Sequence, residues 1–470
     1  MESIKFSDIV RIINGTTDCT YDFDVTGVET DSRRIKQGDA FVCIVGARVD
    51  GHTFIDTCAQ NGAVCAIVSK PVENASIPTI LVESTEEALI ILAKTYYEMM
   101  SPFTVAVTGS CGKTSTKDML FEVFSTSGNT LKTIGNYNST IGLPLTVCRL
   151  SSENKNAVLE MGTGHKGEIA TMCRVVHPDV AVITNIGTCH MEYFQTQENI
   201  FKEKTDLFRA VKPGGTIVIN ADDEYLSKFI DDNTLDVNKI TFGITNDADV
   251  SAINIETFNA EDGIRTEFDI CVKNKDANAI RSVRVHAVMR SLGVHNVYNA
   301  LAATCAGIAA GIPLTKIVNG LKCFVADNMR LNVTKCKDGV TVISDVYNSN
   351  PQAVEAALKA MDNIATGRRI AILGDMLELG TSAKDAHINI GRLAAKYANF
   401  IISRGKMAVH TAGGAAEAIP YKSIQTVNTN AQVIEFLSTF EFLPNDTVLV
   451  KGSRGMQMEE VVDYLINKRF

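Results

Sequence analysis

The residues best suited to chemistry form a short glycine-rich loop between an apolar run and a helical stretch. Backbone N–H groups of such a loop, with the helix N-terminus after it, make an anion site that suits phosphates. Lys113 can reach the β- and γ-phosphates of a nucleotide, and the Thr114 hydroxyl can ligate Mg²⁺. The usual G-x-x-x-x-G-K-[ST] spacing is not met, because Val107 stands six positions before Lys113, so an ordinary strand-to-helix turn is the alternative. The predicted triphosphate-binding residues are Thr108, Gly109, Ser110, Cys111, Gly112, Lys113, Thr114 and Ser115.

Two other side chains are candidates for metal binding. Glu160 lies at the C-terminal end of the apolar run 157–161 and is followed by Gly162. Ligands of open α/β sheets bind outside the carboxyl ends of the strands, and Mg²⁺ often takes one or two carboxylates beside phosphate oxygens. His190 lies in a similar loop, after residues 185–189. The alternatives are a salt-bridged glutamate at a strand end and a loop histidine without a ligand.

The elements that position these residues begin with a small α/β unit in the first hundred residues. Residues 40–45 and 64–68 are short apolar runs bounded by glycine and polar residues, as buried strands are. Residues 85–100 predict a helix that ends before Ser101-Pro102, since proline disfavours a helical conformation in the residue before it. A chain of 470 residues predicts about three domains, and this proline marks the first boundary.

The next segment predicts a mostly parallel sheet with helices on both faces. The run 104–108 leads into the glycine loop and a helix to about residue 125, and apolar runs at 157–161, 180–184 and 216–220 alternate with helical segments. Between residues 250 and 289 apolar residues recur at alternate positions, which predicts a β-rich addition of antiparallel strands with one wet face. These residues are Ile253, Ile255, Phe268, Ile270, Val272, Val283, Val285 and Ala287.

Strand and helix alternate again after about residue 326. The strand candidates are residues 340–344, 370–373, 400–403 and 448–450. This alternation predicts a third, Rossmann-like α/β domain. The predicted fold class is therefore α/β in three domains, with boundaries at 1–100, 101–325 and 326–470.

Composition argues against several classes of protein. A net charge of −9 argues against general nucleic-acid binding. The longest apolar stretches, such as 88–93, are far shorter than the ~20 residues of a membrane span, and no apolar block follows residues 1–5 as in a secretion signal. The twelve cysteines form no C-x-x-C pair. They are predicted to be mostly buried, reduced thiols rather than a zinc site, which fits a cytoplasmic location.

Ordered motifs along the chain resemble the Mur ligases, which build the peptide stem of bacterial cell-wall precursors. Further motifs at 135–138, 141–144, 345–351, 373–380 and 450–454 resemble the family members that add D-alanyl-D-alanine. The resemblance covers nearly the whole chain. The motifs shared with the family at large are the loop 108–114, Leu159-Glu160-Met161-Gly162, Thr184-Asn185-Ile186-Gly187 with His190, and His295-Asn296-Val297-Tyr298-Asn299-Ala300.

The resemblance implies an ATP-dependent amide ligase of peptidoglycan precursor synthesis. Its substrates would be UDP-N-acetylmuramoyl-tripeptide and D-alanyl-D-alanine, joined through an acyl phosphate. The N-terminal domain would hold the UDP-sugar, the central domain would be the ATPase domain, and the C-terminal domain would close over the nucleotide. A monomer without nucleic-acid or membrane partners is expected.

The resemblance also implies roles for residues around the nucleotide. Lys113 and Arg330 would meet the γ-phosphate, and Thr114 with Glu160 would bind a first Mg²⁺. His190 would bind a second Mg²⁺, together with Lys204 if that lysine is carbamylated into a carboxylate-like ligand. The alternative for Lys204 is a solvated helix lysine. The remaining nucleotide contacts implied are Asn296 and Asn299 to adenine and Asp345 to ribose.

The substrate contacts implied by the resemblance come from all three domains. Asp375 and Glu378 would lie in a substrate-facing loop, and Lys451 and Ser453 could contact the dipeptide or the stem. The residues implied to contact the UDP-sugar or the peptide substrates are Asp31, Ser32, Arg33, Asp50, Gly51, His52, Asn136, Asn138, Ser139, Tyr347, Asn348 and Asn350.

The sequence also departs from the family pattern. Cys111 and Ser139 stand where asparagine is common, and Met329 stands where a glycine precedes the arginine. The alternative functions are a ligase of the same fold that adds the third stem residue, a folylpolyglutamate-synthase-like ligase, and a nucleotide-binding scaffold without activity. Retention of Lys113 and Glu160 argues against the scaffold.

Overall fold

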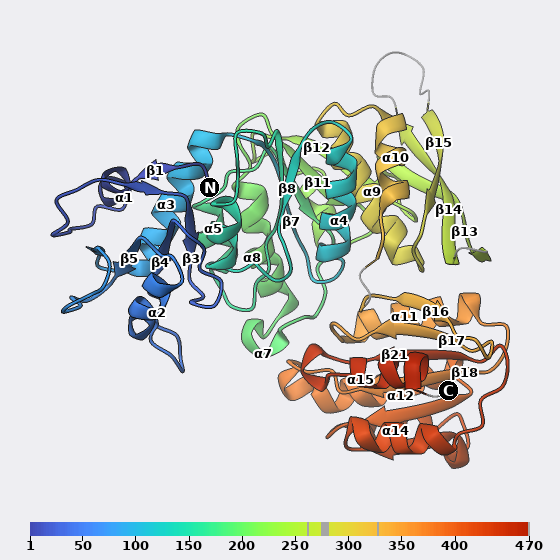
Figure 1. Ribbon diagram of the computed structural model, residues 1–470. Helices are drawn as coiled ribbons and strands as arrows, with labels where there is room; N and C mark the ends of the chain where they lie inside the picture. The colour runs from blue at the N-terminus through green and yellow to red at the C-terminus, as the bar shows by residue number, and fades with distance from the viewer. Residues whose placement is uncertain (261–262, 274–281, 327–328, 469–470) are drawn as a thin grey trace.

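The computed structural model describes residues 1–260, 263–273, 282–326 and 329–468. Three larger β-sheets, of four, nine and six strands, follow one another along the described chain, and helices pack against them (Figure 1). The predicted three-domain α/β class is confirmed. Within the described residues, no helix is long and apolar enough to cross a membrane.

The N-terminal sheet is parallel and has the order β3-β4-β5-β6. Helix α3 ends where the sequence predicts, because Ser101 adopts φ 45° directly before Pro102. A two-stranded pair, β1 and β2, lies beside helix α1. The strands are β1 (Ile4–Lys5), β2 (Asp24–Val25), β3 (Gly27–Glu29), β4 (Asp39–Val42), β5 (Cys65–Val68) and β6 (Thr79–Leu81), and the helices are α1 (Phe6–Ile12), α2 (Ile55–Gln60) and α3 (Thr85–Met100).

The central sheet has the order β15-β14-β13-β12-β11-β10-β7-β9-β8, with β7 between two parallel neighbours. The predicted strands at 104–108, 157–161, 180–184 and 216–220 are present. Its strands are β7 (Phe103–Thr108), β8 (Thr130–Lys132), β9 (Asn156–Glu160), β10 (Val180–Ile183), β11 (Thr216–Asn220), β12 (Asn238–Gly243), β13 (Val250–Ala260), β14 (Gly263–Lys273) and β15 (Ser282–Met289). Its helices are α4 (Lys113–Ser125), α5 (Gly142–Val147), α6 (Glu168–Cys173), α7 (Met191–Phe194), α8 (Gln197–Arg209), α9 (Val294–Ala309) and α10 (Leu314–Cys323).

Alternate residues of β7 face two different cores, which explains its continuous apolar sequence. Ala106 packs in one core with Phe208 of α8, whereas Val107 packs in the other with Leu120 of α4. Tyr96 of α3 belongs to the first core, so the N-terminal domain packs against that side of the central domain. The sheet thus holds the end of β7, and the loop after it, between two packed layers.

The antiparallel strands predicted between residues 250 and 289 extend the central sheet. β13 is parallel to β12, and β14 and β15 continue antiparallel from it. The predicted alternation is wrong at one end of β13, where Ile253 is 42% exposed. The physical reason is a register shift between Ile253 and Glu256, where Asn254 adopts φ 54°.

The C-terminal sheet has the order β16-β17-β21-β18-β19-β20, and β16 is its antiparallel edge strand. All four predicted strands are present. The strands are β16 (Asn332–Lys335), β17 (Thr341–Asp345), β18 (Arg369–Gly374), β19 (Phe400–Arg404), β20 (Ile424–Val427) and β21 (Thr447–Lys451). The helices are α11 (Pro351–Ile364), α12 (Ala383–Tyr397), α13 (Ala408–Ala415), α14 (Asn430–Thr439) and α15 (Glu459–Asp463).

Candidate active site

A cavity of about 760 Å³ lies where the glycine-rich loop, the ends of the central strands and the first segments of the C-terminal domain meet. Most of the predicted site residues line it. They are Ser110, Cys111, Gly112, Lys113, Thr114, Ser115, Asn138, Ser139, Glu160, His190, Asn296, Asn299, Arg330, Asp345, Tyr347, Asn348 and Asn350.

The two glycines of the loop are there because the backbone runs close to neighbouring side chains. Gly112 adopts φ 83°, and a Cβ on it would lie 2.5 Å from Asn299 Oδ1. Gly109 adopts φ 150°, and a Cβ there would lie 1.9 Å from Thr184 Oγ1. The loop therefore turns tightly against α9 on one side and the end of β10 on the other.

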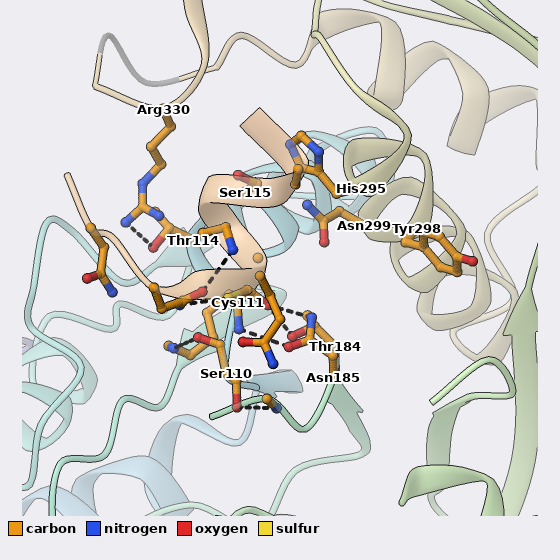
Figure 2. A pocket seen from close by; sticks show the side chains of 18 of the residues that line it. Ser110, Cys111, Thr114, Ser115, Thr184, Asn185, His295, Tyr298, Asn299 and Arg330 are labelled. Atoms are coloured by element: carbon orange, nitrogen blue, oxygen red, sulfur yellow. Dashed lines mark hydrogen bonds between the residues drawn. The ribbon is translucent and has the colours of Figure 1, made fainter. Parts of the chain in front are cut away.

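Two backbone N–H groups of the glycine-rich loop are already bonded within the protein. The Ser110 N–H donates to the Asn185 carbonyl oxygen at 3.0 Å, and the Cys111 N–H donates to Asn185 Oδ1 at 3.0 Å (Figure 2). These two donors hold the loop onto the strand-end segment after β10. The N–H groups that helix geometry leaves without carbonyl partners lie in the first turn of α4, so binding of phosphate there stays the prediction.

Lys113 lies at the start of α4 and turns back over the loop. Its Nζ donates to the Gly109 carbonyl oxygen at 2.7 Å and to the Ser110 carbonyl oxygen at 3.3 Å. Thr108, at the end of β7, is buried and donates from Oγ1 to the Met161 carbonyl oxygen at 2.7 Å. Thr108 and Gly109 thus shape the loop without lining the cavity.

Thr114 is the meeting point of three parts of the chain. Its Oγ1 donates to Glu160 Oε1 at 3.3 Å and accepts from Arg330 Nη2 at 3.0 Å. Asn138 Nδ2 donates to the same Glu160 oxygen at 2.7 Å. The other oxygen, Glu160 Oε2, is buried and makes no hydrogen bond within the described residues. A buried carboxylate oxygen beside a threonine hydroxyl has the chemistry of a Mg²⁺ ligand.

His190 links the central and C-terminal domains. It adopts φ 56° directly before helix α7, and its Nδ1 lies 2.7 Å from Glu378 Oε2. This contact lowers the pKa of the Glu378 carboxyl, although burial acts in the opposite direction. Glu378 thus contacts a residue of the cavity wall without lining the cavity itself, and its contact with substrate stays a prediction.

Lys204 lies on α8 behind the loop and is 2% exposed, so the alternative of a solvated helix lysine is excluded. Burial, and then the charge of Lys113, lower the pKa of Lys204 to about 7. Within the described part of the chain its ammonium group makes no hydrogen bond or ion pair. It does not line the cavity, but it lies close enough to Lys113 for the charge of that residue to act on it.

The two asparagines predicted to contact adenine are partly occupied with each other. Asn299 Nδ2 donates to Asn296 Oδ1 at 3.1 Å, and Asn296 Nδ2 donates to the Leu292 carbonyl oxygen at 3.0 Å. Both side chains are buried at the cavity wall. Contact of either amide with a base stays a prediction.

Sequence reasoning missed a polar pair on the same wall. The Tyr298 hydroxyl donates to Asp222 Oδ2 at 2.7 Å, and both residues line the cavity (Figure 2 shows Tyr298). Burial raises the pKa of Asp222, but hydrogen bonds from the backbone N–H groups of Ile244 and Thr245 bring it down to about 2. The available signal was the position of Asp222 just after the strand ending at Asn220, where α/β sheets bind ligands.

The C-terminal domain contributes residues that are already engaged with one another. Lys451 Nζ forms an ion pair with Asp345 and donates to the Asn348 carbonyl oxygen at 2.9 Å. Arg330 lies over the Tyr347 ring, 4.1 Å from its centroid. Both arrangements place charged groups at the cavity, whereas contact with ribose or peptide stays a prediction.

Asn350 has a structural role that the sequence did not suggest. Its Oδ1 accepts from the Ala353 N–H at 2.8 Å and caps α11. Its Nδ2 lies 3.2 Å from Cys111 Sγ and 3.0 Å from Cys189 Sγ. The oxygen and nitrogen of the amide thus already have hydrogen-bond partners at the helix end and at two thiols, which leaves few positions for a bond to substrate.

The predicted UDP-sugar residues lie apart from this cavity and hold local turns. Asp31 pairs with Arg33, and Asp50 accepts from the His52 N–H at 3.0 Å. Tyr137, which sequence reasoning passed over, lies between Arg34 and Arg149, whose guanidinium carbons are 5.3 and 4.6 Å from its ring centroid. The predicted residues outside the cavity lining are Asp31, Ser32, Arg33, Asp50, Gly51, His52, Thr108, Gly109, Asn136, Lys204, Asp375, Glu378 and Ser453. Contact of the N-terminal residues and of Asn136 with substrate stays a prediction.

Three family profiles match successive parts of the chain. They are described as the catalytic domain of the Mur ligase family over residues 24–97, the Mur ligase middle domain over 107–307, and the Mur ligase glutamate ligase domain over 329–454. The UDP-N-acetylmuramoyl-tripeptide--D-alanyl-D-alanine ligase of Bacillus subtilis is 33% identical over 448 residues, which is 94% of this chain and 93% of the relative. The chain belongs to the Mur ligase family.

Solved structures agree with this Mur ligase assignment. A structure of MurF from Acinetobacter baumannii aligns over 100% of both chains with a TM-score of 0.89 and 30% identity. The MurF ligase from Thermotoga maritima in complex with ADP aligns over 93% of this Mur ligase and 96% of that chain, with a TM-score of 0.80 and 28% identity. The family and the ADP complex support ATP use by this Mur ligase.

Proposed function

We propose that this Mur ligase joins D-alanyl-D-alanine to UDP-N-acetylmuramoyl-tripeptide through an acyl phosphate made with ATP. The observation that carries the proposal is the convergence of Lys113, Thr114, Glu160 and Arg330 at one cavity from three separate segments. The relatives that match over nearly the full chain carry the name of this ligase. The proposal extends that activity to this chain.

The chemistry needs ATP because a carboxylate is a poor acyl donor. The substrate carboxylate attacks the γ-phosphorus, ADP leaves, and an acyl phosphate forms. The amine of D-alanyl-D-alanine then attacks the acyl carbon, and the tetrahedral intermediate expels phosphate as the nitrogen loses a proton. Lys113 and Arg330 neutralise phosphate charge, and the loop and α4 position the nucleotide.

The site also suits divalent cations. Among the described residues, no group of three or more His, Cys, Asp or Glu side chains gathers to hold a metal ion. Cations here would therefore rely on phosphate oxygens for part of their coordination. Thr114 and Glu160 would hold one Mg²⁺, and His190 with Lys204 a second, and such ions supply charge neutralisation for phosphoryl transfer.

Carbamylation of Lys204 fits its surroundings. A neutral amine adds to carbon dioxide and loses a proton, which gives a carbamate with two oxygen ligands. The buried position and the lowered pKa of Lys204 favour the neutral amine that this addition requires. Restored activity of Lys204→Ala with added short carboxylates would support the carbamate, and no restoration would argue against it.

Phosphate release from ATP is the deciding measurement. We expect release only when both UDP-N-acetylmuramoyl-tripeptide and D-alanyl-D-alanine are present, with a UDP-pentapeptide product visible by mass spectrometry. Release that is unchanged when the dipeptide is omitted would overturn the proposal. A product formed instead from the UDP-dipeptide and a diamino acid would identify a ligase that adds the third stem residue.

The oligomeric state and cellular location are part of the same proposal. We also propose a monomer, and light scattering after size exclusion would test it. All twelve cysteines are free thiols, which agrees with a reducing cytoplasm. A mass of two chains would contradict the proposed monomer.

A further inference from the structure

Two cysteine side chains meet directly behind the phosphate loop. Asn350 Nδ2 lies 3.2 Å from Cys111 Sγ and 3.0 Å from Cys189 Sγ. The distance between the two sulfurs therefore cannot exceed the sum of these two distances. Both thiols thus lie against the same amide nitrogen of Asn350. Rotation about the two Cα–Cβ bonds is the movement that brings such neighbouring sulfurs to bonding distance.

The two thiols differ in their access to small molecules. Cys111 lines the cavity, whereas Cys189 is 7% exposed and lies outside the lining. Cys189 Sγ is 3.5 Å from the Ser110 carbonyl oxygen, which places it against the underside of the loop. A reagent that enters the cavity therefore meets Cys111 first, with Cys189 behind it.

We propose that Cys111 and Cys189 are a peroxide-reactive thiol pair that closes to a disulfide and disables the phosphate loop. The loss of activity rests on the proposed ATP-dependent function, but formation of the disulfide does not. The pair joins the loop before α4 to the segment before His190. A disulfide between these two segments would displace both the phosphate loop and His190 from the positions in which they meet the nucleotide.

The chemistry balances with a hydroperoxide as the oxidant. The Cys111 sulfur attacks the terminal oxygen of the peroxide, the O–O bond breaks, and an alcohol or water leaves, so Cys111 becomes a sulfenic acid. The Cys189 sulfur then attacks the Cys111 sulfur, the S–O bond breaks, and water leaves with the thiol proton. Two electrons pass from the two sulfurs to the peroxide.

The surroundings favour Cys111 as the group that reacts first. The neighbouring Cys189 thiol, and then the Asn350 amide, lower the pKa of Cys111 below its ordinary value against the effect of burial. Thiolate character and access together make a cysteine susceptible to peroxide. Burial raises the pKa of the Cys43 and Cys148 thiols to about 12, so those cysteines are poor competitors.

The test treats the full chain with hydrogen peroxide and maps the peptides by mass spectrometry without reduction. We expect a cross-linked peptide pair containing Cys111 and Cys189, lighter by two hydrogen atoms than the sum of the reduced peptides. We also expect ATP-dependent turnover to fall by about 10²-fold, as displacement of a positioning group can cause. Dithiothreitol is expected to restore turnover.

Three variants separate this reaction from general oxidation. The turnover of each variant after peroxide treatment is compared with the turnover of the same variant in its reduced form. Cys189→Ser removes the second thiol, so peroxide should add oxygen to Cys111 without a cross-link, and Cys111→Ser should likewise give no cross-link. Cys323→Ser is the matched control, because Cys323 is exposed and far in sequence from the loop. This control should still form the cross-link and should still show a reversible loss of ATP-dependent turnover.

Two results would overturn the proposal. One is the absence of the cross-linked peptide at peroxide concentrations that oxidise the exposed Cys323. The other is a cross-link that leaves turnover unchanged. A chain that forms the cross-link but has no ligase activity when reduced would refute the proposed function and keep the thiol pair.

Discussion

Arg330 Nη2 donates a hydrogen bond to Thr114 Oγ1 at 3.0 Å, although 216 residues separate them in the chain. The guanidinium also lies over the Tyr347 ring of the C-terminal domain. One arginine therefore connects the start of α4 in the central domain with the segment between β17 and α11 of the C-terminal domain. Nucleotide contact and domain position are coupled through this side chain.

Removal of this arginine should impair ATP use. We expect Arg330→Ala to lower kcat/KM for ATP by about 10- to 100-fold, because a hydrogen bond to a charged group contributes roughly 1.5–3 kcal/mol. Arg330→Lys should recover only part of the loss, since lysine lacks the planar fork that stacks on an aromatic ring. Arg392→Ala, an exposed pair with Glu417, is the control. Unchanged kinetics in Arg330→Ala would contradict the role.

Lys113 should matter in the transition state more than in folding. We expect Lys113→Ala to lower kcat by about 10²–10³-fold, as loss of one preorganised charge-stabilising group does. Its melting temperature should stay close to that of the wild type. The matched control is Lys322→Ala on the exposed end of α10, which should turn over normally. Near-normal turnover by Lys113→Ala would refute the assignment.

Lys204 should make stability depend on pH in alkaline solution. Its pKa is lowered from 10.5 to about 7 by burial and by the charge of Lys113. Between these values the unfolded chain carries a proton that the folded protein has lost, so stability rises with pH across this range. Below about pH 7 both states are protonated, and the cost of burying the ammonium remains in full.

The Lys204 prediction is tested by denaturant unfolding in buffer purged of carbon dioxide. Lys204→Met should be more stable than the wild type at about pH 6, and the difference should shrink towards about pH 9. Lys202→Met, on the same helix but exposed and paired with Glu198, should show no such change. A difference that does not vary with pH would show that Lys204 is not buried as an amine.

Asp222 should contribute stability that is lost in acid. Its pKa is about 2 in the folded protein, below the ordinary 3.8, so its contribution is present above about pH 4 and disappears as pH falls towards 2. Asp222→Ala also leaves backbone N–H groups without a partner, which costs about 1–3 kcal/mol in the free energy of unfolding at neutral pH. Urea titrations of the wild type and the variant at several pH values measure this free energy of unfolding. Asp231→Ala, which changes an exposed neighbour, should have no measurable effect on it.

Local patterns in the sequence predicted much of this protein. Buried runs such as 104–108 and 448–450 become strands because every residue of a two-sided parallel sheet meets a core. The glycine-rich loop, and the break at Pro102, depend on backbone preferences of a few consecutive residues. The weak point was Ile253, where a register shift reverses the side that a residue faces.

Tertiary structure alone decided how the site is completed. The sequence named Lys113, Thr114 and Glu160, but only tertiary packing brings Arg330 to Thr114, Asn185 to the loop and Asn350 to two thiols. Burial of Lys204 behind the loop also depends on how α8 packs. Such contacts join residues far apart in the chain, so no local preference encodes them. They are set by how whole helices and sheets pack, which is why the phosphate loop was evident from the sequence and its partners were not.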